Sequence, residues 1–383
     1  MELLLHQWGD WPELYRNTDK TEATEIVIID SQMNYRGKLD TYLSWAILHG
    51  TNHTCYSNKR NRIIRRQSMK QSVSHYMMPH DREEDIEKTL RKLHLDGIEN
   101  LIYGTEPALH PADRITLGCH LAYWPDWMDF YLGKKDFYEK DFPTKQSLMD
   151  TFGGTTVEAW IEKIRRNIRA ALVEKPEYLV WHVAHCSLDE IWTRRFRYSS
   201  REVLKAAAEV YGAVASEVPP SVTVLFENIF WPGLYTLEPE EVDYFFSLLP
   251  GKNTGIMLDT GHLMNTNPRL ATEEDGACYV KDVVNRLGSM KSLILGIHLS
   301  CSLSGAYQRS LPGTIPASVT PDIISRHIIS IDQHRPFTTS AARDIVDCVE
   351  PRYVTHELFG SDFSIPEDKV RLQMKAAGLW NRS

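Results

Sequence analysis

Short apolar runs that alternate with amphipathic helical patterns are the feature that most constrains the fold of this chain. From about residue 80 onward, runs rich in β-branched and aromatic residues recur in series with segments of helical periodicity. Seven such units in a row predict a parallel sheet with helices packed outside it. The expected strands are 98–103, 115–120, 178–182, 222–227, 255–259, 293–298 and 353–357, and the expected helices are 84–95, 157–173, 201–214, 239–248, 275–287 and 341–349.

The number of strands and the length of the chain together predict an α/β fold, the (β/α)8 TIM barrel. With Leu3–His6 taken as a first strand, the strands number eight, which is what closes such a barrel. A TIM barrel needs roughly 250 residues, so the 383 residues of the chain leave room for excursions within a single domain, 1–383. We interpret 9–79, which breaks the alternation and carries a basic run at 58–66, as a long insertion after the first strand. Such an insertion is either a surface excursion or a lid over a substrate.

A second, smaller excursion is expected between the seventh strand and its helix. Residues 300–330 are rich in Ser, Gly and Pro, and we expect them to form a long loop at the rim of the barrel.

Composition and charge disfavour several classes of protein. The net charge of -8 gives no overall attraction to nucleic acid, which is therefore a possible but disfavoured partner. No apolar run reaches the roughly 18 residues of a membrane span, and the first six residues lack the features of a signal peptide. The six cysteines lie far apart and form no CxxC pair, which argues against a disulfide framework or a zinc knuckle. We expect a cytoplasmic protein with no membrane partner.

Metal-capable side chains stand at the ends of most of the predicted strands. Because all strand ends of a TIM barrel face the same rim, these residues are expected to converge on one pocket. Imidazole and carboxylate groups are ligands of Zn²⁺, Mn²⁺ and Fe²⁺. Burying several carboxylates together without a cation would be unfavourable by several kcal/mol. We therefore predict a site for divalent metal ions, with zinc favoured and manganese or iron as alternatives. The strand-end residues are His120, His182, Glu227, Asp259, His298 and Glu357.

Two short motifs add candidate ligands to this set. Asp259-Thr-Gly-His262 places a second ligand three residues after a strand end, and Asp332-Gln-His334 places a carboxylate and an imidazole two residues apart. Side chains two apart in an extended segment point to the same side and can face one ion. The aromatic stretch Tyr123-Trp-Pro-Asp-Trp127, beyond His120, is interpreted either as core or as a wall for a ring-shaped ligand.

In this order of motifs the sequence resembles the xylose-isomerase-like TIM barrels, and among them most closely the endonuclease IV family. The resemblance covers roughly residues 80 to 360, and the Asp-Thr-x-His box is its strongest element. The matching segments are Cys119-His120-Leu-Ala-Tyr123, Val180-Trp-His182, Phe226-Glu227-Asn228, Leu258-Asp259-Thr260-Gly261-His262, His298-Leu299, Asp332-Gln-His334 and Glu357.

The resemblance implies nine ligands that hold three ions. Glu227 would bridge two ions, and His120 and His182 would complete the first. Asp259, His298 and Glu357 would hold the second ion. His262, Asp332 and His334 would hold the third.

Two departures from the family pattern disfavour a role in DNA repair. The Asp-x-His box continues as His334-Arg-Pro-Phe337, where the family has a glycine-containing turn. Ser300-Cys-Ser302 stands where a polar Asn-Asp-Ser usually follows the His-Leu pair. Neither departure touches the nine implied ligands.

Three chemistries are compatible with this set of residues. The favoured one is hydrolysis of a phosphoester at a two- or three-ion site, with Glu227 and Glu357 as catalytic carboxylates. The second is isomerisation or epimerisation of a sugar or sugar phosphate at one ion held by Glu227, Asp259, His298 and Glu357. The third is oxidation of a peptide by clustered iron, which a sister family performs. The expected substrate is a small molecule, a sugar phosphate or a phosphodiester, and a barrel that serves only as a scaffold is the non-enzymatic alternative.

Overall fold

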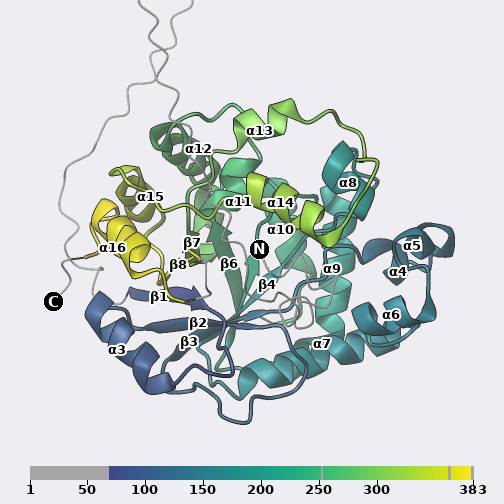
Figure 1. The fold of residues 1–383 in the computed structure, drawn as a ribbon, viewed down its shortest axis with the longest axis horizontal. Coiled ribbons are helices and arrows are strands. Elements are labelled where there is room, and N and C mark those ends of the chain that lie inside the picture. Colours follow the sequence, from purple (N-terminus) through teal and green to yellow (C-terminus); the bar gives the residue numbers. More distant parts are fainter. Residues whose placement is uncertain (1–68, 252, 361–363, 381–383) are drawn as a thin grey trace, which may run out of the picture. The chain divides into compact units, whose positions relative to one another are not determined.

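A closed barrel of eight parallel strands forms the centre of the computed structural model, which describes residues 69–251, 253–360 and 364–380 (Figure 1). The strands follow one another around the barrel in chain order, and β1 pairs with β8 to close it. The seven strands expected after residue 80 all form, each within one residue of its expected bounds. The strands are β1 (Lys70–His75), β2 (Gly97–Ile102), β3 (Thr116–Leu121), β4 (Tyr178–His182), β5 (Thr223–Glu227), β6 (Thr254–Asp259), β7 (Ile294–Leu299) and β8 (Tyr353–His356).

The first strand of the barrel lies inside the segment that was expected to be an insertion. Strand β1 pairs with β2 on one side and with β8 on the other, so the prediction of an insertion over 9–79 is wrong for 70–75. The strand expected at Leu3–His6 lies outside the described residues, and the barrel closes without it. The sequence of β1, KQSVSH, escaped notice because Val73 is its only aliphatic residue. The buried hydroxyl of Ser72 is accommodated by a hydrogen bond, since it lies 3.0 Å from the hydroxyl of Thr355.

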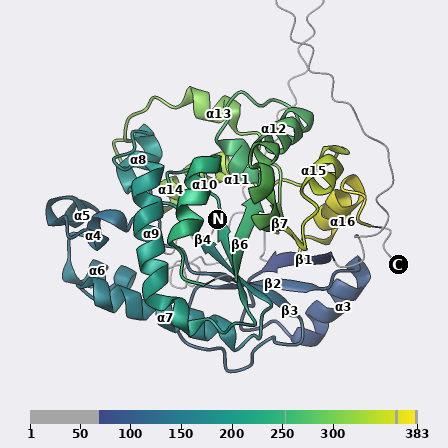
Figure 2. The same ribbon diagram turned by 180° about the vertical axis from the view of Figure 1, so that it is seen from behind.

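Side-chain caps mark the start of several helices that cover the barrel. Thr156 caps α7 by accepting a hydrogen bond from the N–H of Ala159, and Ser199 and Glu202 form a capping box at the start of α9. Figures 1 and 2 show the helices arranged around the strands. They are α3 (Glu83–Leu93), α4 (Met128–Tyr131), α5 (Lys135–Asp141), α6 (Lys145–Phe152), α7 (Val157–Leu172), α8 (Leu188–Thr193), α9 (Ser200–Val214), α10 (Pro239–Leu248), α11 (Thr260–Asn265), α12 (Glu273–Arg286), α15 (Ala341–Val349) and α16 (Glu367–Ala376).

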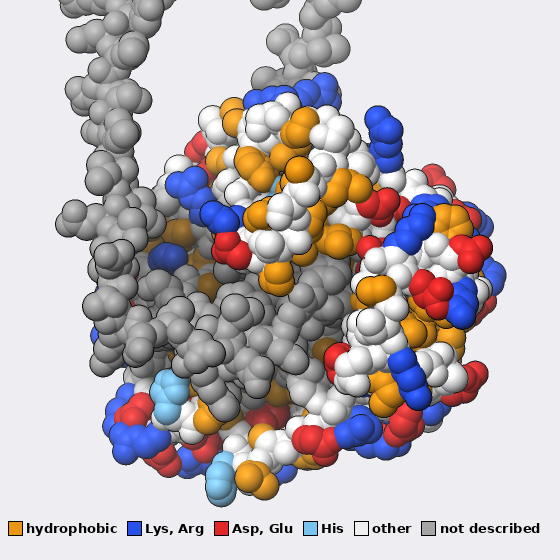
Figure 3. All heavy atoms as spheres, turned by 45° about the vertical axis from the view of Figure 1, so that its right-hand side comes forward, with side chains coloured by type: hydrophobic (Ala, Val, Ile, Leu, Met, Phe, Trp, Pro, Cys, Tyr) orange, Lys and Arg blue, Asp and Glu red, His pale blue; other side chains and the backbone are white. Residues whose placement is uncertain are grey.

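The excursion after β7 is helical where an irregular rim loop was expected. Within 300–330 the chain forms α13 (Gly305–Ser310) and most of α14 (Pro321–Ile331). Helix α14 buries Ile324, Ile328 and Ile331 against a second apolar cluster, and this spacing of apolar residues is helical. Figure 3 shows hydrophobic side chains mixed with polar ones on the upper part of the molecule, in the region of α13 and α14. Several of the Ser, Gly and Pro residues that suggested a loop lie within these helices, among them Gly305, Ser310 and Pro321.

The inside of the barrel is filled by side chains and is not a pore. Tyr178 and Tyr353 meet there with their ring centroids 4.5 Å apart, among Leu117, Val180, Leu225 and Met257. Gly118 makes room for this layer, because a Cβ at that position would lie 2.2 Å from the ring of Tyr178. The interior packing leaves the ends of the strands as the place where polar side chains can gather. No helix among the described residues is both long enough and apolar enough to cross a membrane.

Candidate metal centre

The structure brings all nine of the predicted ligands together at the carboxyl ends of the strands. They form three groups, two of which share Glu227, and within each group one ligand atom of every residue lies within 4.8 Å of the others. All nine side chains are buried. Group 1 consists of His120, His182 and Glu227, group 2 of Glu227, Asp259, His298 and Glu357, and group 3 of His262, Asp332 and His334.

Glu227, the last residue of β5, lies between groups 1 and 2. Its Oε2 is 3.1 Å from Nε2 of His120 and 3.4 Å from Nε2 of His182. Its Oε1 lies on the other side, 3.3 Å from Nδ1 of His298 and 3.1 Å from Nδ1 of His262. The two carboxylate oxygens therefore face different groups, which is the arrangement of a carboxylate that bridges two ions.

Group 2 gathers its ligands from the ends of four strands, β5 to β8. Nδ1 of His298 is 3.3 Å from Glu227 Oε1, 3.5 Å from Glu357 Oε2 and 3.9 Å from Asp259 Oδ2. Asn228 ties two of these strands together, since its amide donates to the carbonyl of Asp259 and accepts from the N–H of Asp259. The position of Asp259 is thus held by its neighbour on β5 as well as by its own strand.

Group 3 lies where loops and short helices meet beyond the strands. Asp332 ends α14 and places Oδ2 3.1 Å from Nε2 of His262 and 2.8 Å from Nε2 of His334. The Asp259 side chain caps α11 by accepting from the N–H of His262, which brings His262 back over the strand ends. His334 has a φ of 42°, a left-handed conformation that is uncommon for a residue other than glycine. Such strained backbone is concentrated at functional sites.

The buried polar atoms of group 2 fit a metal ion. Glu227 Oε1, Asp259 Oδ2, His298 Nδ1 and Glu357 Oε2 are buried, and none has a hydrogen-bond partner among the described residues. Buried polar atoms are nearly always satisfied, so four that point at one another require a further partner. Ligand atoms bound about 2.0–2.1 Å from a tetrahedral zinc lie about 3.3–3.4 Å apart. The observed separations of 3.3, 3.5 and 3.9 Å come close to that spacing.

Charge gives a second reason for cations at this site. Burial raises the pKa of the Glu227 carboxyl, but His182 and His298 outweigh burial and hold the pKa well below its usual range. Burial lowers the pKa of His298, yet the carboxylates of Glu99 and Glu227 raise it well above 6.5. The pKa of His262 is likewise raised well above 6.5, by Asp259 and Asp332 acting against burial. Protonated histidines thus balance the carboxylates in the metal-free protein, and divalent ions can replace those protons.

Most of the histidine rings are oriented by hydrogen bonds to the backbone. Nδ1 of His120 is 3.0 Å from the carbonyl of Leu121, and Nδ1 of His262 is 3.0 Å from the carbonyl of Asn228. Nδ1 of His334 is 3.2 Å from a carbonyl as well. A ring that donates Nδ1–H to a carbonyl leaves the lone pair of Nε2 free for a metal. In all three residues Nε2 is the atom that faces a carboxylate of its group.

One buried residue of the site, Glu99 on β2, was missed in the sequence. It is fully buried, and Nε2 of His298 lies 2.9 Å from its Oε1. A charged residue inside the largely apolar run GIENLI was a signal that could have been noticed. An interior carboxylate is rarely tolerated without a partner.

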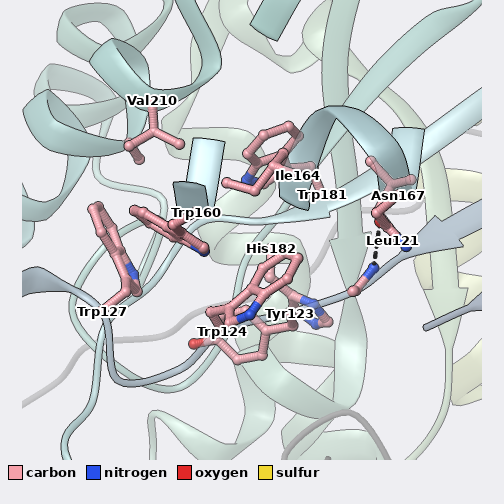
Figure 4. Close-up of a pocket in the computed structure, with 12 residues that line it drawn as sticks. Leu121, Tyr123, Trp124, Trp127, Trp160, Ile164, Asn167, Trp181, His182 and Val210 are labelled. Carbon is pink, nitrogen blue, oxygen red and sulfur yellow. Dashed lines mark hydrogen bonds between the residues drawn. The ribbon is translucent and has the colours of Figure 1, made fainter. Parts of the chain in front are cut away.

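The aromatic stretch after β3 packs as core. Trp124, Trp127, Trp160 and Trp181 surround a small cavity behind His182, which has a volume of about 30 Å³ (Figure 4). The rings of Trp127 and Trp160 lie 5.5 Å apart. A cavity of this size holds a water molecule and not a sugar ring. The interpretation of the tryptophans as core is therefore favoured over that of a substrate wall.

Comparisons with known proteins find similarity in solved structures. No family model matches the chain, and no curated protein sequence matches it. A D-tagatose 3-epimerase-like protein matches with a TM-score of 0.47 and 14% identity, over 82% of this chain and 98% of its own. Endonuclease IV from Thermus thermophilus matches with a TM-score of 0.48 and 11% identity, over 81% of this chain and 98% of its own. The IOLI protein with a bound zinc atom matches with a TM-score of 0.43 and 13% identity, over 82% and 99%. These similarities identify neither a substrate nor a reaction.

Proposed function

We propose that this protein is a metal-dependent enzyme that hydrolyses a phosphoester at a centre of two or three divalent ions. The observation that carries the proposal is the placement of Glu227, whose two oxygens face histidines of different groups at 3.1–3.4 Å. A carboxylate in this position joins two neighbouring ions and holds them at a set separation. Adjacent ions are the arrangement that enzymes use for displacement at phosphorus.

The charge of the centre favours an anionic substrate. Four of the nine ligands are carboxylates and five are histidines, so the ligands carry a charge of -4 when the histidines are neutral. Three divalent ions contribute +6, which leaves an excess of +2. The oxygens of a phosphoester supply the negative charge that such a centre attracts.

The residues of the chain position the ions and handle protons. When bound, the ions lower the pKa of a coordinated water and stabilise charge on the attacking and leaving oxygens. Glu357 borders two groups, with Oε2 3.5 Å from Nδ1 of His298 and 3.6 Å from Nδ1 of His334. Its pKa is lowered to about 2, because His298 and His334 outweigh burial, so its carboxylate is ionised and can accept a hydrogen bond. Burial of the nine ligands keeps bulk water from competing for them.

A second candidate reaction is the isomerisation or epimerisation of a sugar or sugar phosphate at a single ion. The observation that favours it is that group 2 alone offers four ligands, three of them carboxylates. One ion there would polarise a carbonyl, and a carboxylate would transfer the proton. Iron in all three groups would instead suit oxidation of a peptide. The identity and number of the bound ions separate these reactions.

The deciding experiment is elemental analysis of protein purified without added metal, followed by assays on matched substrates. Two or three zinc ions per chain, with hydrolysis of bis(p-nitrophenyl) phosphate, support the proposal. One manganese per chain, with exchange of the α-proton of a ketose and no phosphate release, would replace it with the isomerase. Several irons per chain would favour the oxidase. A Glu227→Gln protein serves as the inactive control in each assay.

A further inference from the structure

The buried carboxylate of Glu99 stands behind one ligand of the proposed centre and belongs to none of its three groups. Strand β2 contributes this side chain to the barrel interior. Nε2 of His298 lies 2.9 Å from Oε1 and 3.0 Å from Oε2 of Glu99. The opposite ring nitrogen, Nδ1, is the atom that faces Glu227, Asp259 and Glu357.

His298 is therefore oriented in the opposite sense to three other histidines of the centre. In His120, His262 and His334 it is Nε2 that faces a carboxylate of the residue's own group, and the hydrogen-bond partner of Nδ1 is a neutral backbone carbonyl. Nδ1 of His262 and of His334 also lies 3.1 and 3.6 Å from a carboxylate of group 2, Glu227 and Glu357 respectively. In His298 the nitrogen that faces away from its group is Nε2, and its partner is a carboxylate. A charged acceptor forms a stronger hydrogen bond than a neutral one and makes the ring a better electron donor to a metal.

The carboxylate of Glu99 is itself held in place by hydroxyl groups. Tyr178 donates its phenolic hydrogen to Glu99 Oε2 at 2.9 Å, and the hydroxyl of Thr355 lies 3.2 Å from the same oxygen. The hydroxyl of Ser72 is in turn 3.0 Å from that of Thr355. These three residues come from β1, β4 and β8, so the whole barrel interior fixes the position of Glu99.

We infer that Glu99 is a positioning residue that acts through His298. It strengthens the binding of the group 2 ion more than the binding of the ions of groups 1 and 3. Its carboxylate accepts the Nε2–H of His298, and this fixes the tautomer in which Nδ1 has a free lone pair. It also holds the ring so that this lone pair points at Glu227, Asp259 and Glu357. The inference rests on the metal-binding part of the proposed function and not on the reaction catalysed.

The effect of Glu99 on metal affinity can be estimated from hydrogen-bond partners of metal ligands in other proteins. Removal of a hydrogen-bond partner behind a ligand typically weakens metal binding by about 10- to 100-fold. Changing Glu99 to Gln retains an oxygen that can accept from His298 but removes the charge. We therefore expect Glu99→Gln to weaken the binding of the group 2 ion by about 10- to 100-fold. The affinities for the ions of groups 1 and 3 should change much less.

The test measures the affinity of each ion by zinc titration in the presence of a competing chelator. The matched control is Glu174→Gln, since Glu174 is also a buried carboxylate but accepts the N–H of Ala112, away from the centre. Circular dichroism and the melting temperature of the metal-free proteins establish that both variants fold. We expect the binding of one ion, that of group 2, to be weakened in Glu99→Gln, and the binding of all three ions to be unchanged in Glu174→Gln.

A double-mutant cycle that combines Glu99→Gln with His298→Ala separates positioning of His298 from a general structural effect of the Glu99 change. If Glu99 acts through His298, Glu99→Gln has no further effect on the metal affinity of the His298→Ala protein. The inference would be overturned if Glu99→Gln lowered the metal affinity equally in the wild-type and the His298→Ala proteins. It would also be overturned if Glu99→Gln lowered the affinity for all three ions equally, or left it unchanged. If Glu99→Gln does not fold, Tyr178→Phe removes one hydrogen bond to Glu99, and unchanged affinity in that variant would also overturn it. A wild-type protein that binds no metal refutes the proposed function itself.

Discussion

The bridging position of Glu227 leads to a prediction about two ions at once. Glu227→Gln keeps the size of the side chain and removes the charge from both oxygens. Structural zinc sites contribute about 10–16 kcal/mol, or about 2.5–4 kcal/mol for each of four ligands. Because about 1.4 kcal/mol of binding free energy corresponds to a factor of ten in affinity, the loss of one ligand weakens the binding of an ion by about 10²- to 10³-fold. Because Glu227 belongs to groups 1 and 2, we expect both of these ions to be weakened.

The order in which the ions are lost also follows from the structure. Group 1 would be left with two protein ligands, His120 and His182, whereas group 2 would keep three. The group 1 ion should therefore leave first when the variant is dialysed against increasing chelator, with zinc counted by elemental analysis. Asp332→Asn is the control, because it alters only group 3. A Glu227→Gln protein that keeps all its ions, or that loses only one under every condition, would refute the bridging role.

Three further predictions test other parts of the structure. The double change Asp332→Ala with His334→Ala should lower the metal count by about one ion without unfolding the barrel; unchanged metal content and turnover would favour a single-ion enzyme. In the metal-free protein, the raised pKa values of His262 and His298 add stability that is fully present below pH 6.5 and lost as the pH rises through the folded-state values. The melting temperature of the metal-free protein should therefore fall as the pH is raised above 6.5, and an equal fall in the metal-loaded protein would contradict this. Gly118→Ala should lower the free energy of unfolding by about 1–3 kcal/mol in urea titrations, since its methyl group would overlap a tyrosine ring; unchanged stability would show that the barrel interior has spare room.

Much of the fold and most of the candidate site could be predicted because parallel strands impose a simple geometry. Seven strands were recognisable because strands buried on both faces appear as apolar runs, and helices between them show a period of 3.6 residues. Residues that follow such runs share one rim whatever the details of packing. For that reason His120, Glu227 and Glu357, which are far apart in the sequence, could be placed together before any coordinates were known.

What the tertiary structure alone decided concerns segments and side chains whose local sequence carries little information. Strand β1 has one aliphatic residue, and it becomes a strand because β2 and β8 offer hydrogen-bonding edges on both sides. The role of Glu99 depends on which way its strand faces and on its distance from His298, 199 residues along the chain. The two directions of the Glu227 oxygens depend on the twist of the barrel and on histidines from three other strands. Sequence determined which residues reach the rim, because strand order and direction suffice for that, whereas the pairing of individual atoms required the packed barrel interior that orients them.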